Sequence, residues 1–498
     1  MKKMNLLAMS LVSAAALSFS SCSSNDDLTS GGGTQSQADG VYMTLKISGA
    51  TSHGTRTGVT ADKTTAENGN EAESTITEGM MYIYDGNTCV FRKVITKEMF
   101  QTQPNQTTAG VTKPIKVAVT GAITTGKKYD VYFLANRTNV DNPIAATSIF
   151  TSNTGGADFA TDNNFVMFNQ NDGTKAAAHS KVEFTDAAKS DKSPAAADEI
   201  KLDRVVARID RPSFAETVTT VTPATDTKTS INVADVVAGI SYEGFAVSNL
   251  NNNSYVMQNW DTNFKTLSVK WGEPKYSLPK STYGTLYNAE GLANFDTKEK
   301  PVSWKYAFEN TTTDVNDATA VYFKVKVALT ETAMAASDFK DGTFYRYDGR
   351  LYTSIKAIFD NATTGEISNP FTETNSITPA DVVAKISDAD GKLTTDEAKL
   401  AKFRQDYKIE VYRQGTMYYR WAISDNAYKP FVASDPTHTY SVLRNSIYRL
   451  NVTKVSEIGK DVPNGPEPDD PIKNPNFFMN VTVSINPWVL NAQPIELK

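Results

Sequence analysis

Cysteine and histidine, on which most metal centres and many nucleophilic sites depend, are almost absent from this sequence. Among 498 residues there are two cysteines and three histidines. The histidines His53, His179 and His438 are scattered, and no two of them are spaced as a metal-binding pair would be. No glycine-rich phosphate loop precedes a predicted helix. The chain is therefore predicted not to be an enzyme and to hold no cofactor.

The sequence also lacks a large excess of charge of one sign and a long hydrophobic run. Lysine and arginine number 50 against 56 aspartates and glutamates, a net charge of −6 with both signs interspersed. This balance argues against a nucleic-acid partner. No apolar stretch reaches the length of a transmembrane helix, about 20 residues. The chain is predicted to be held at a membrane by lipid or not at all.

The beginning of the chain has the pattern of a lipoprotein signal peptide. Two lysines precede an apolar and small-residue stretch over 6–19, and two serines and Cys22 follow it. Residues 1–21 are predicted to be removed and Cys22 to carry lipid, although Phe19 replaces the usual leucine. Cys89 then has no disulfide partner and is predicted to be a small buried side chain. The acidic run after Cys22 resembles a surface-export signal; a solvated tether is the alternative.

Short runs of alternating apolar and polar residues recur along the rest of the chain. They are rich in Val, Thr, Tyr and Phe and are bounded by Asn, Asp, Gly and Pro. This pattern predicts an all-β fold with few short helices, built from antiparallel β-sandwiches. The clearest helix is predicted to begin at Asp396. Strands are predicted to begin at Val41, Met80, Val131, Val205, Val321 and Val481.

Changes in composition divide the chain into five segments. A weakly patterned, Thr-rich stretch near residues 213–230 indicates a domain boundary, and the proline-rich stretch after residue 462 cannot hold a regular strand. The predicted segments are the signal peptide 1–21, a flexible tether 22–40, an N-terminal sandwich 41–215 with a removable first strand 41–56, a C-terminal sandwich 216–461, and a linker with a candidate donor strand 462–498.

Two strands at opposite ends of the mature chain have interchangeable patterns. Each has four apolar residues that alternate with polar ones, so each places four apolar side chains on one face. Burying four such side chains contributes roughly 6–12 kcal/mol before ordering costs. A groove built for one strand could receive the other in register. The four are Val41, Met43, Leu45 and Ile47 in the first strand, and Met479, Val481, Val483 and Ile485 in the last, where Trp488 is predicted to fill a groove end.

The loop after the first strand is predicted to be cleavable. Arg56 and Thr57 lie in a polar, glycine-containing segment, where proteolytic cutting concentrates. A cut between them would free the first strand and leave an open edge above an apolar groove, which recruits other strands. The last strand of a neighbour could fill it by β-augmentation. The alternative is that Arg56 is an ordinary loop residue and that the last strand closes its own sheet.

Eight segments in order carry a family resemblance. They are YDVYFLANRT from Tyr129, LDRVVARID from Leu202, YEGFAVSNLNNNSYVMQNW from Tyr242, YAFENT from Tyr306, FYRYDGRLYTS from Phe344, GTMYYRWAI from Gly415, SVLRNSIYRLNV from Ser441 and VTVSINPW from Val481. Together they resemble the fimbrillins of Bacteroidales type V pili, particularly the major subunit of the minor fimbriae.

The resemblance implies two transthyretin-like β-sandwich domains in tandem and assembly by donor-strand exchange. It implies removal of the first strand by an Arg-specific protease at Arg56, where Thr57 departs from the family's alanine. The apolar last strand favours a role in the shaft. The implied location is the outer membrane for the lipidated precursor and then the surface fimbrium, in adhesion, biofilm formation or colonisation. The implied partners are copies of the chain, anchor and tip pilins, the lipoprotein export machinery, the protease, and receptors on host or bacterial surfaces.

A weak calcium candidate lies before the predicted helix. Asp388, Asp390 and Glu397 are spaced as ligands in a calcium loop would be, with Gly391 between them. The first ligand position is occupied by Ile386, which removes a central carboxylate. A turn followed by a helix N-cap uses the same residues equally well, so no metal is predicted.

A monomeric surface adhesin or glycan-binding lipoprotein is the alternative function. In that hypothesis Tyr418, Tyr419 and Trp421 line a binding site. The alternation of Tyr419, Trp421 and Ile423 favours a position in the core instead.

Overall fold

The computed structural model describes most of the mature chain. Cys22, Arg56 and Thr57 lie outside the described residues, as do the predicted signal peptide and most of the linker before the last strand. The described residues are 40–49, 67–101, 114–145, 147–171, 180–214, 233–259, 303–312, 315, 318–372, 377–423, 440–455, 458–462 and 479–489.

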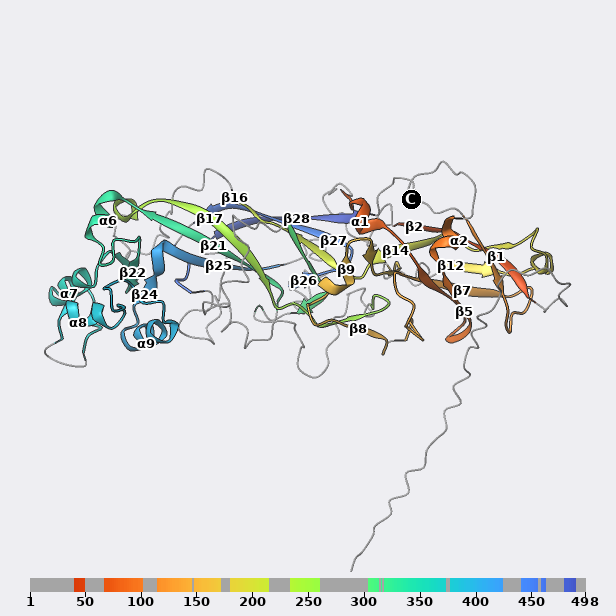
Figure 1. The fold of residues 1–498 in the computed structure, drawn as a ribbon, viewed down its shortest axis with the longest axis horizontal. Coiled ribbons are helices and arrows are strands. Elements are labelled where there is room, and N and C mark those ends of the chain that lie inside the picture. The colour runs from red at the N-terminus through yellow and green to blue at the C-terminus, as the bar shows by residue number, and fades with distance from the viewer. Residues whose placement is uncertain are drawn as a thin grey trace, which may run out of the picture.

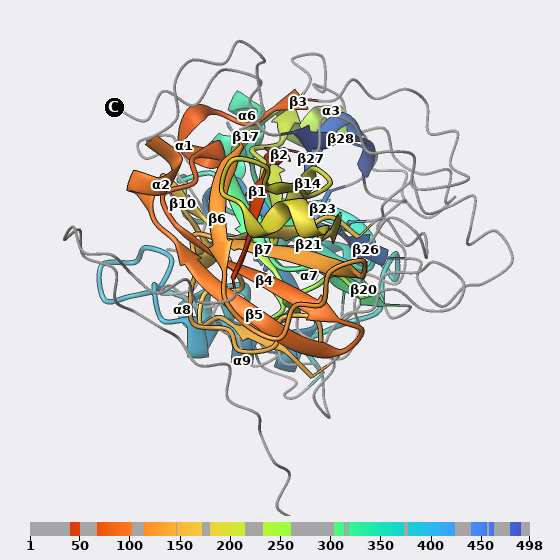
Figure 2. The ribbon, with the colours of Figure 1, turned by 90° about the vertical axis from the view of Figure 1, so that its right-hand side faces the viewer.

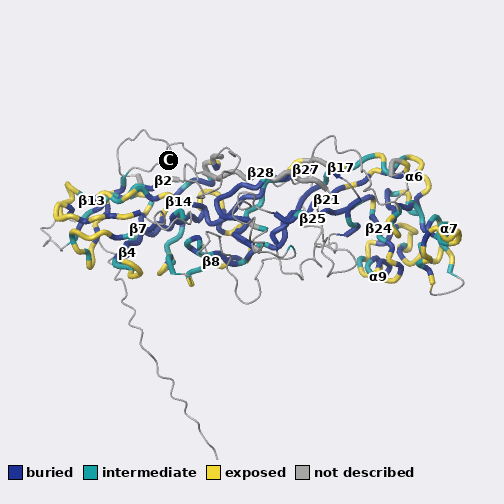
Figure 3. Tube along the Cα trace, turned by 180° about the vertical axis from the view of Figure 1, so that it is seen from behind, coloured by how far each residue is buried: buried dark blue, intermediate teal, exposed yellow. Residues whose placement is uncertain are grey.

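The described residues form an elongated molecule with two β-sandwiches along its long axis and a small helical region at one end (Figure 1). Most elements are strands in antiparallel sheets, and the longest described helix, α9 (Glu397–Tyr407), has 11 residues. The prediction of an all-β fold with few short helices is confirmed. Buried residues follow the strands of both sandwiches, whereas exposed residues gather in loops and on helices (Figure 3). Within the described ranges, no helix is long and apolar enough to span a membrane.

Two sheets enclose the core of the N-terminal sandwich. Their strands are β1 (Val41–Leu45), β2 (Ile47–Gly49), β4 (Gly79–Asp85), β5 (Thr88–Ile95), β6 (Ile115–Val119), β7 (Lys128–Ala135), β11 (Met167–Asn169), β12 (Ser180–Glu183), β13 (Ala195–Ala196) and β14 (Ile200–Arg204). The smaller sheet has the order β13-β1-β6, and the larger has the order β2-β14-β11-β7-β4-β5 with β12 beside β7. Their facing side chains form one apolar core.

Glycine and asparagine fix the ends of the central strands in this sandwich. The hairpin from β4 to β5 turns at Gly86, whose φ of 58° is the left-handed conformation that a two-residue turn requires. At the start of β4, a Cβ on Gly79 would lie 2.3 Å from Cζ of Phe133, so only glycine lets β4 approach β7. Asn136 ends β7 in the left-handed conformation, with φ of 59°.

The C-terminal sandwich also has two sheets around one core. Its strands are β15 (Ala207–Asp210), β16 (Ser213–Phe214), β17 (Val237–Ser248), β19 (Trp304–Ala307), β21 (Ala320–Leu329), β25 (Thr416–Ala422), β27 (Ser446–Val455) and β28 (Met479–Val489), joined by β3 (Glu67–Asn68) from the N-terminal part. One sheet has the order β19-β15-β27-β28-β3, with β16 beside β27, and the other has the order β17-β21-β25.

Short elements connect the two sandwiches. Antiparallel pairing joins β18 (Asn253–Tyr255) to β8 (Ile149–Thr151), so a segment from the second half of the chain lies on the N-terminal sandwich. The remaining short elements lie between the strands of the two sandwiches along the chain; they are α1 (Glu71–Ser74), α2 (Lys97–Gln101), β9 (Ala160–Thr161), β10 (Asn164–Phe165), α3 (Val233–Val236), β20 (Asn310–Thr312), α6 (Glu331–Ala336), β26 (Tyr440–Val442), and the 3-10 turns η1 (Ala157–Phe159) and η2 (Asp186–Lys189).

The helical region has an apolar core of its own. It contains β22 (Phe344–Tyr347), β23 (Arg350–Tyr352), α7 (Ile355–Thr363), α8 (Pro379–Ala384), α9, β24 (Glu410–Tyr412) and the turn η4 (Arg413–Gly415). The rings of Phe359 and Phe371 stack with centroids 4.0 Å apart. The helix predicted from Asp396 is confirmed, because the Asp396 carboxylate accepts hydrogen bonds from the amides of Ala398 and Lys399 at the start of α9.

The chain passes from one sandwich core to the other between Val206 and Ala207. Val206 belongs to the N-terminal core and Ala207 to the C-terminal core. Val256, Phe308 and Ile447, from the second half of the chain, also pack into the N-terminal core. The domain division near residue 215 stays a prediction.

Candidate functional site

The first strand lies inside the smaller sheet, between β6 and β13, and in the described part of the chain neither of these pairs with another strand of that sheet. On one side β1 pairs antiparallel with β6, from Val41 opposite Val119 to Leu45 opposite Ile115. On the other side it pairs parallel with β13, with Met43 opposite Ala195. In the end-on view β1 lies beside β6 near the centre of the sandwich (Figure 2). Without β1, the strands β6 and β13 would face each other across a gap one strand wide.

The same segment continues into the larger sheet. β2 pairs parallel with β14, from Ile47 opposite Ile200. The amide of Ala197 donates to the Thr44 carbonyl oxygen at 3.1 Å, and that of Ile200 to the Lys46 carbonyl oxygen at 2.9 Å. Residues 41–49 therefore run beside 195–202 from one sheet to the other. We call the space they occupy, bounded by β6, β13 and β14, the first-strand slot.

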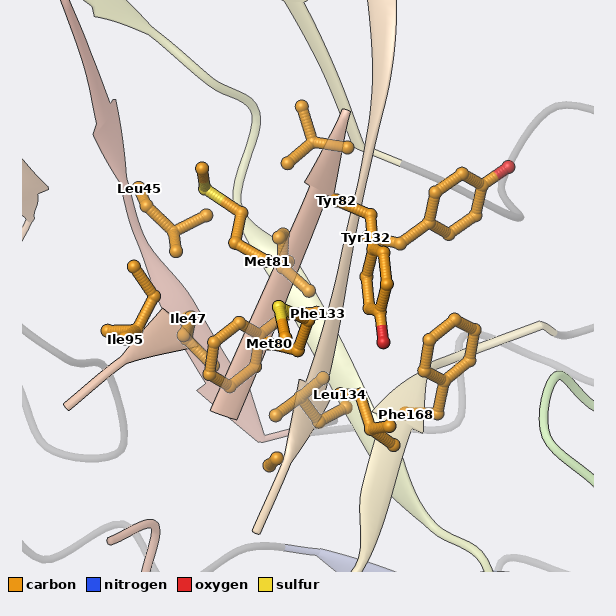
Figure 4. Close-up of a cluster of buried hydrophobic side chains, with 14 of the residues drawn as sticks. Leu45, Ile47, Met80, Met81, Tyr82, Ile95, Tyr132, Phe133, Leu134 and Phe168 are labelled. Atoms are coloured by element: carbon orange, nitrogen blue, oxygen red, sulfur yellow. The ribbon is translucent and has the colours of Figure 1, made fainter. Parts of the chain in front are cut away.

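The inward face of the first strand is buried in the N-terminal core. Val41 is 6 % exposed, Met43 and Leu45 are 0 % exposed and Ile47 is 1 % exposed. Leu45 and Ile47 point toward side chains such as Met81 and Ile95 of the larger sheet (Figure 4). An empty slot would therefore expose apolar surface on both sheets. That the strand is displaced stays a prediction.

Charges at the rim of the slot hold the first strand only weakly. Lys46 Nζ lies 3.1 Å from the Glu199 carboxylate, with side chains 42 % and 34 % exposed. A pair this exposed contributes about 0–1 kcal/mol. The retention of the strand therefore depends on apolar burial and the backbone ladders.

The predicted donor strand lies in its own C-terminal sheet. β28 pairs antiparallel with β27, from Ser446 opposite Pro487 to Val455 opposite Met479. Within one subunit it thus closes its own sheet, the arrangement that the sequence left as the alternative. On its other edge β28 meets, in the described part of the chain, only β3, at Trp488 and Val489. The pattern of Met479, Val481, Val483, Ile485 and Trp488 belongs to this strand, and its role as donor stays a prediction.

A buried charge cluster joins the two sandwiches beside this strand. The Glu73 carboxylate, from α1, is fully buried and accepts hydrogen bonds from Arg208 Nη1 at 3.1 Å and from the Tyr306 hydroxyl at 2.8 Å. Arg204 Nε donates to the Glu73 carbonyl oxygen at 2.9 Å, and Arg204 Nη1 donates to Asn445 Oδ1 at 3.2 Å. Glu73, Arg204, Arg208, Tyr306 and Asn445 form what we call the Glu73 cluster. The elements that carry them come from both sandwiches.

Burial sets the electrostatics of the Glu73 cluster. It lowers the pKa of Arg204 to about 9, against the opposing charge of Glu73, so the guanidinium remains charged at neutral pH. Burial and the Glu73 carboxylate raise the pKa of Tyr306, which keeps its hydroxyl a hydrogen-bond donor. Arg204 and Arg208 are both paired and buried. The sequence gave no sign of Glu73, because an acidic residue in a short polar stretch is typical of a protein surface.

The weak calcium candidate is used for local structure. Asp388 Oδ1 accepts hydrogen bonds from the amides of Asp390 and Lys392, each at 2.9 Å, which closes a turn. Glu397 forms an ion pair with Arg413 at 2.5 Å. Among the described residues no three metal-ligating side chains are grouped as a metal ion would need.

The aromatic residues proposed for a glycan site face inward. Tyr418 and Tyr419 are 4 % and 2 % exposed, and Trp421 packs against the C-terminal core. They form no exposed aromatic platform. Cys89, predicted to be buried, is half-buried and packs against the N-terminal core.

Comparisons with known proteins identify one family. Residues 410–494 match the model of the family described as "Major fimbrial subunit protein type IV, Fimbrillin, C-terminal". This segment contains β24 to β28, and the match confirms the resemblance to fimbrillins there. No curated protein is significantly similar in sequence to the chain.

Several solved structures are similar. A fimbrilin from Porphyromonas gingivalis W83 has 16 % identity and a TM-score of 0.39, with 91 % of this chain and 99 % of that chain covered. A proposed cell adhesion protein from Parabacteroides distasonis ATCC 8503 has 14 % identity and a TM-score of 0.38, with 93 % and 99 % covered. The tip fimbrial protein Mfa3 from Porphyromonas gingivalis, truncated at its C-terminus, has 12 % identity and a TM-score of 0.30, with 90 % and 100 % covered.

Proposed function

We propose, starting from the fimbrillin match of residues 410–494, that this protein is a structural subunit of a bacterial surface fimbria assembled by donor-strand exchange. One observation carries the proposal. Among the residues that the structure describes, the first strand alone links β6 to β13 in their sheet, and its inward face fills the core. When this strand leaves, it opens an apolar groove with β6 on one side and β13 on the other. A single strand with the same alternating pattern fits that groove.

The exchange begins with hydrolysis of the peptide bond between Arg56 and Thr57. The released fragment, 41–56, takes its lipidated upstream segment with it and leaves the first-strand slot open. The last strand of a neighbouring subunit enters antiparallel to β6 and parallel to β13 and β14, the directions that β1 and β2 have. Its apolar residues take the places of Val41, Met43, Leu45 and Ile47.

Apolar burial favours this exchange, and backbone pairing does not oppose it. On β27 the last strand is paired from Met479 to Pro487. A strand placed like the first strand pairs with β6 over 41–45, with β13 at positions 43 and 44, and with β14 over 47–49, so it regains about as many backbone pairs as it loses. Filling four apolar positions contributes roughly 6–12 kcal/mol before ordering costs. These terms offset the loss of the pairing between β27 and β28.

The finer parts of the proposal are supported by the signal-peptide pattern and by the resemblance to fimbrillins. Cys22 carries the lipid that holds the precursor at the outer membrane, and the cut releases the subunit into the fimbrium. The partners are copies of the chain, anchor and tip pilins, the export machinery, an Arg-specific protease and surface receptors. The filament serves adhesion, biofilm formation or colonisation.

Cutting the purified precursor with an Arg-specific protease is expected to produce a ladder of high-mass species that resists warm detergent. The reason is that the cut opens the first-strand slot while the last strands of other subunits are present. Gel electrophoresis after incubation at several protein concentrations measures the ladder. Arg56→Ala is the matched control, which keeps the fold and removes the cut site. A subunit cut at Arg56 that stays monomeric at every concentration would count decisively against donor-strand exchange.

A further inference from the structure

β3 pairs with the end of β28 that extends beyond β27. β27 accompanies β28 only as far as Pro487, opposite Ser446. The next two residues, Trp488 and Val489, pair with Glu67 and Asn68 of β3. Strands open from their ends, where pairing is least supported. β3 therefore holds the end of β28 at which opening would begin.

β3 is itself firmly held on its downstream side. Two residues after it, Asn70 caps α1: its Oδ1 accepts from the Glu73 amide, and the Glu73 carboxylate accepts from the Asn70 amide, each at 2.8 Å. The same carboxylate is fixed by Arg208 and Tyr306. The Glu73 cluster thus places β3 against β28.

On its upstream side β3 is tied to the first strand. β2 ends at Gly49 in the first-strand slot, and residues 50–66 join it covalently to β3. This connection contains Arg56. One stretch of chain therefore links the strand that the proposed cut removes, the proposed cut site and the contact on β28. A cut there leaves β3 anchored from α1 alone.

We infer that β3 is a latch that retains β28 on its own sheet until the first strand is removed. The inference rests on the proposed function, because a latch matters only if β28 is to leave. While the loop is intact, β3 is held from both sides and covers the end of β28. After the cut its upstream hold is gone, and the end of β28 opens more often. The latch couples release of the donor strand to opening of the first-strand slot. An uncut subunit therefore has neither a released donor strand nor an open slot.

Proline substitutions in β3 test the latch on monomers. Successive backbone amides of a strand point to opposite edges, so of residues 67 and 68 one amide faces β28 and the other faces away. Glu67→Pro and Asn68→Pro remove these amides one at a time, and Asn68→Ala keeps both. Hydrogen exchange by mass spectrometry is followed in peptides covering 481–489 of the uncut precursor. Exchange in β4 is followed in the same samples as a check that the fold is intact.

The latch predicts that at least one proline variant speeds exchange at Trp488 and Val489 by roughly three- to tenfold, the effect of one lost hydrogen bond. Asn68→Ala should leave exchange unchanged. Cutting the wild-type precursor, at a dilution where it stays monomeric, should speed exchange at the same residues. Equal exchange in wild type, both proline variants and the cut protein would overturn the latch. Because these are monomer measurements, that result is separate from a failure of cut protein to polymerise, which would overturn the proposed function.

Discussion

Replacing Leu45 with alanine is expected to weaken the precursor strongly and to leave the assembled polymer unchanged. Leu45 is fully buried in the N-terminal core, and a Leu→Ala change at such a site costs about 2–5 kcal/mol of the free energy of unfolding. In the polymer this residue has left with fragment 41–56, so its identity no longer matters. Urea unfolding of the uncut precursor and the detergent-dissociation temperature of the polymer measure the two effects.

The same substitution is expected to speed polymerisation after the cut, since a first strand that is held less tightly leaves the slot sooner. Thr44→Ala is the matched control on the opposite face of the strand, where Thr44 is half-buried and its hydroxyl lies 3.5 Å from the Ala195 carbonyl oxygen. It should change the stability of the precursor by no more than about 0.5 kcal/mol. A polymer weakened by Leu45→Ala as much as the precursor would mean that the first strand remains in the polymer.

Replacing Glu73 with alanine is expected to lower the free energy of unfolding by about 3–5 kcal/mol, the cost of removing one partner of a buried ion pair. Arg208 would lose its buried carboxylate partner and the Tyr306 hydroxyl its acceptor. Because the elements that carry these residues belong to both sandwiches, the two halves should also unfold less cooperatively. Urea titration followed by tryptophan fluorescence and by far-ultraviolet circular dichroism measures both effects.

An exposed ion pair gives the comparison for Glu73. Lys356 and Asp360 lie 2.7 Å apart on α7 with side chains 71 % and 60 % exposed. Asp360→Ala should change stability by about 0.5 kcal/mol or less. Suppose that Glu73→Ala lowers the free energy of unfolding no more than Asp360→Ala does, and that fluorescence and circular dichroism still report one shared transition. The Glu73 cluster would then not be what joins the sandwiches.

Periodicity allowed much of the fold to be predicted from the sequence. The alternation of Val41, Met43, Leu45 and Ile47 marks one face of a strand, and that face is buried. The acidic start and basic later turns of the segment after Asp396 mark a helix, and α9 lies there. Both signals are local, because a strand or helix with one apolar face repeats its pattern within a few residues.

The rest depends on contacts between residues far apart in the chain. Glu73 and Arg208 are 135 positions apart, and no local pattern distinguishes a buried paired charge from a solvated one. The sequence also left two positions open for the last strand, because an alternating strand fits its own sheet or a neighbour's slot equally well. The structure places it on β27 within one subunit. The separate core of the helical region was not predicted, since it forms by contacts among short segments spread over 345–411.

The most direct test of donor-strand exchange is to identify the strand that fills the first-strand slot in the polymer. Subunits carrying Ala118→Cys on β6 are mixed with subunits carrying Asn480→Cys, both lacking Cys89, then cut, oxidised and examined by mass spectrometry. Tyr42 lies opposite Ala118, and Asn480 takes the place of Tyr42 if the two strands bind in the same register. Donor-strand exchange predicts a disulfide between different subunits and polymers free of fragment 41–56. Polymers that retain this fragment in every slot would contradict it.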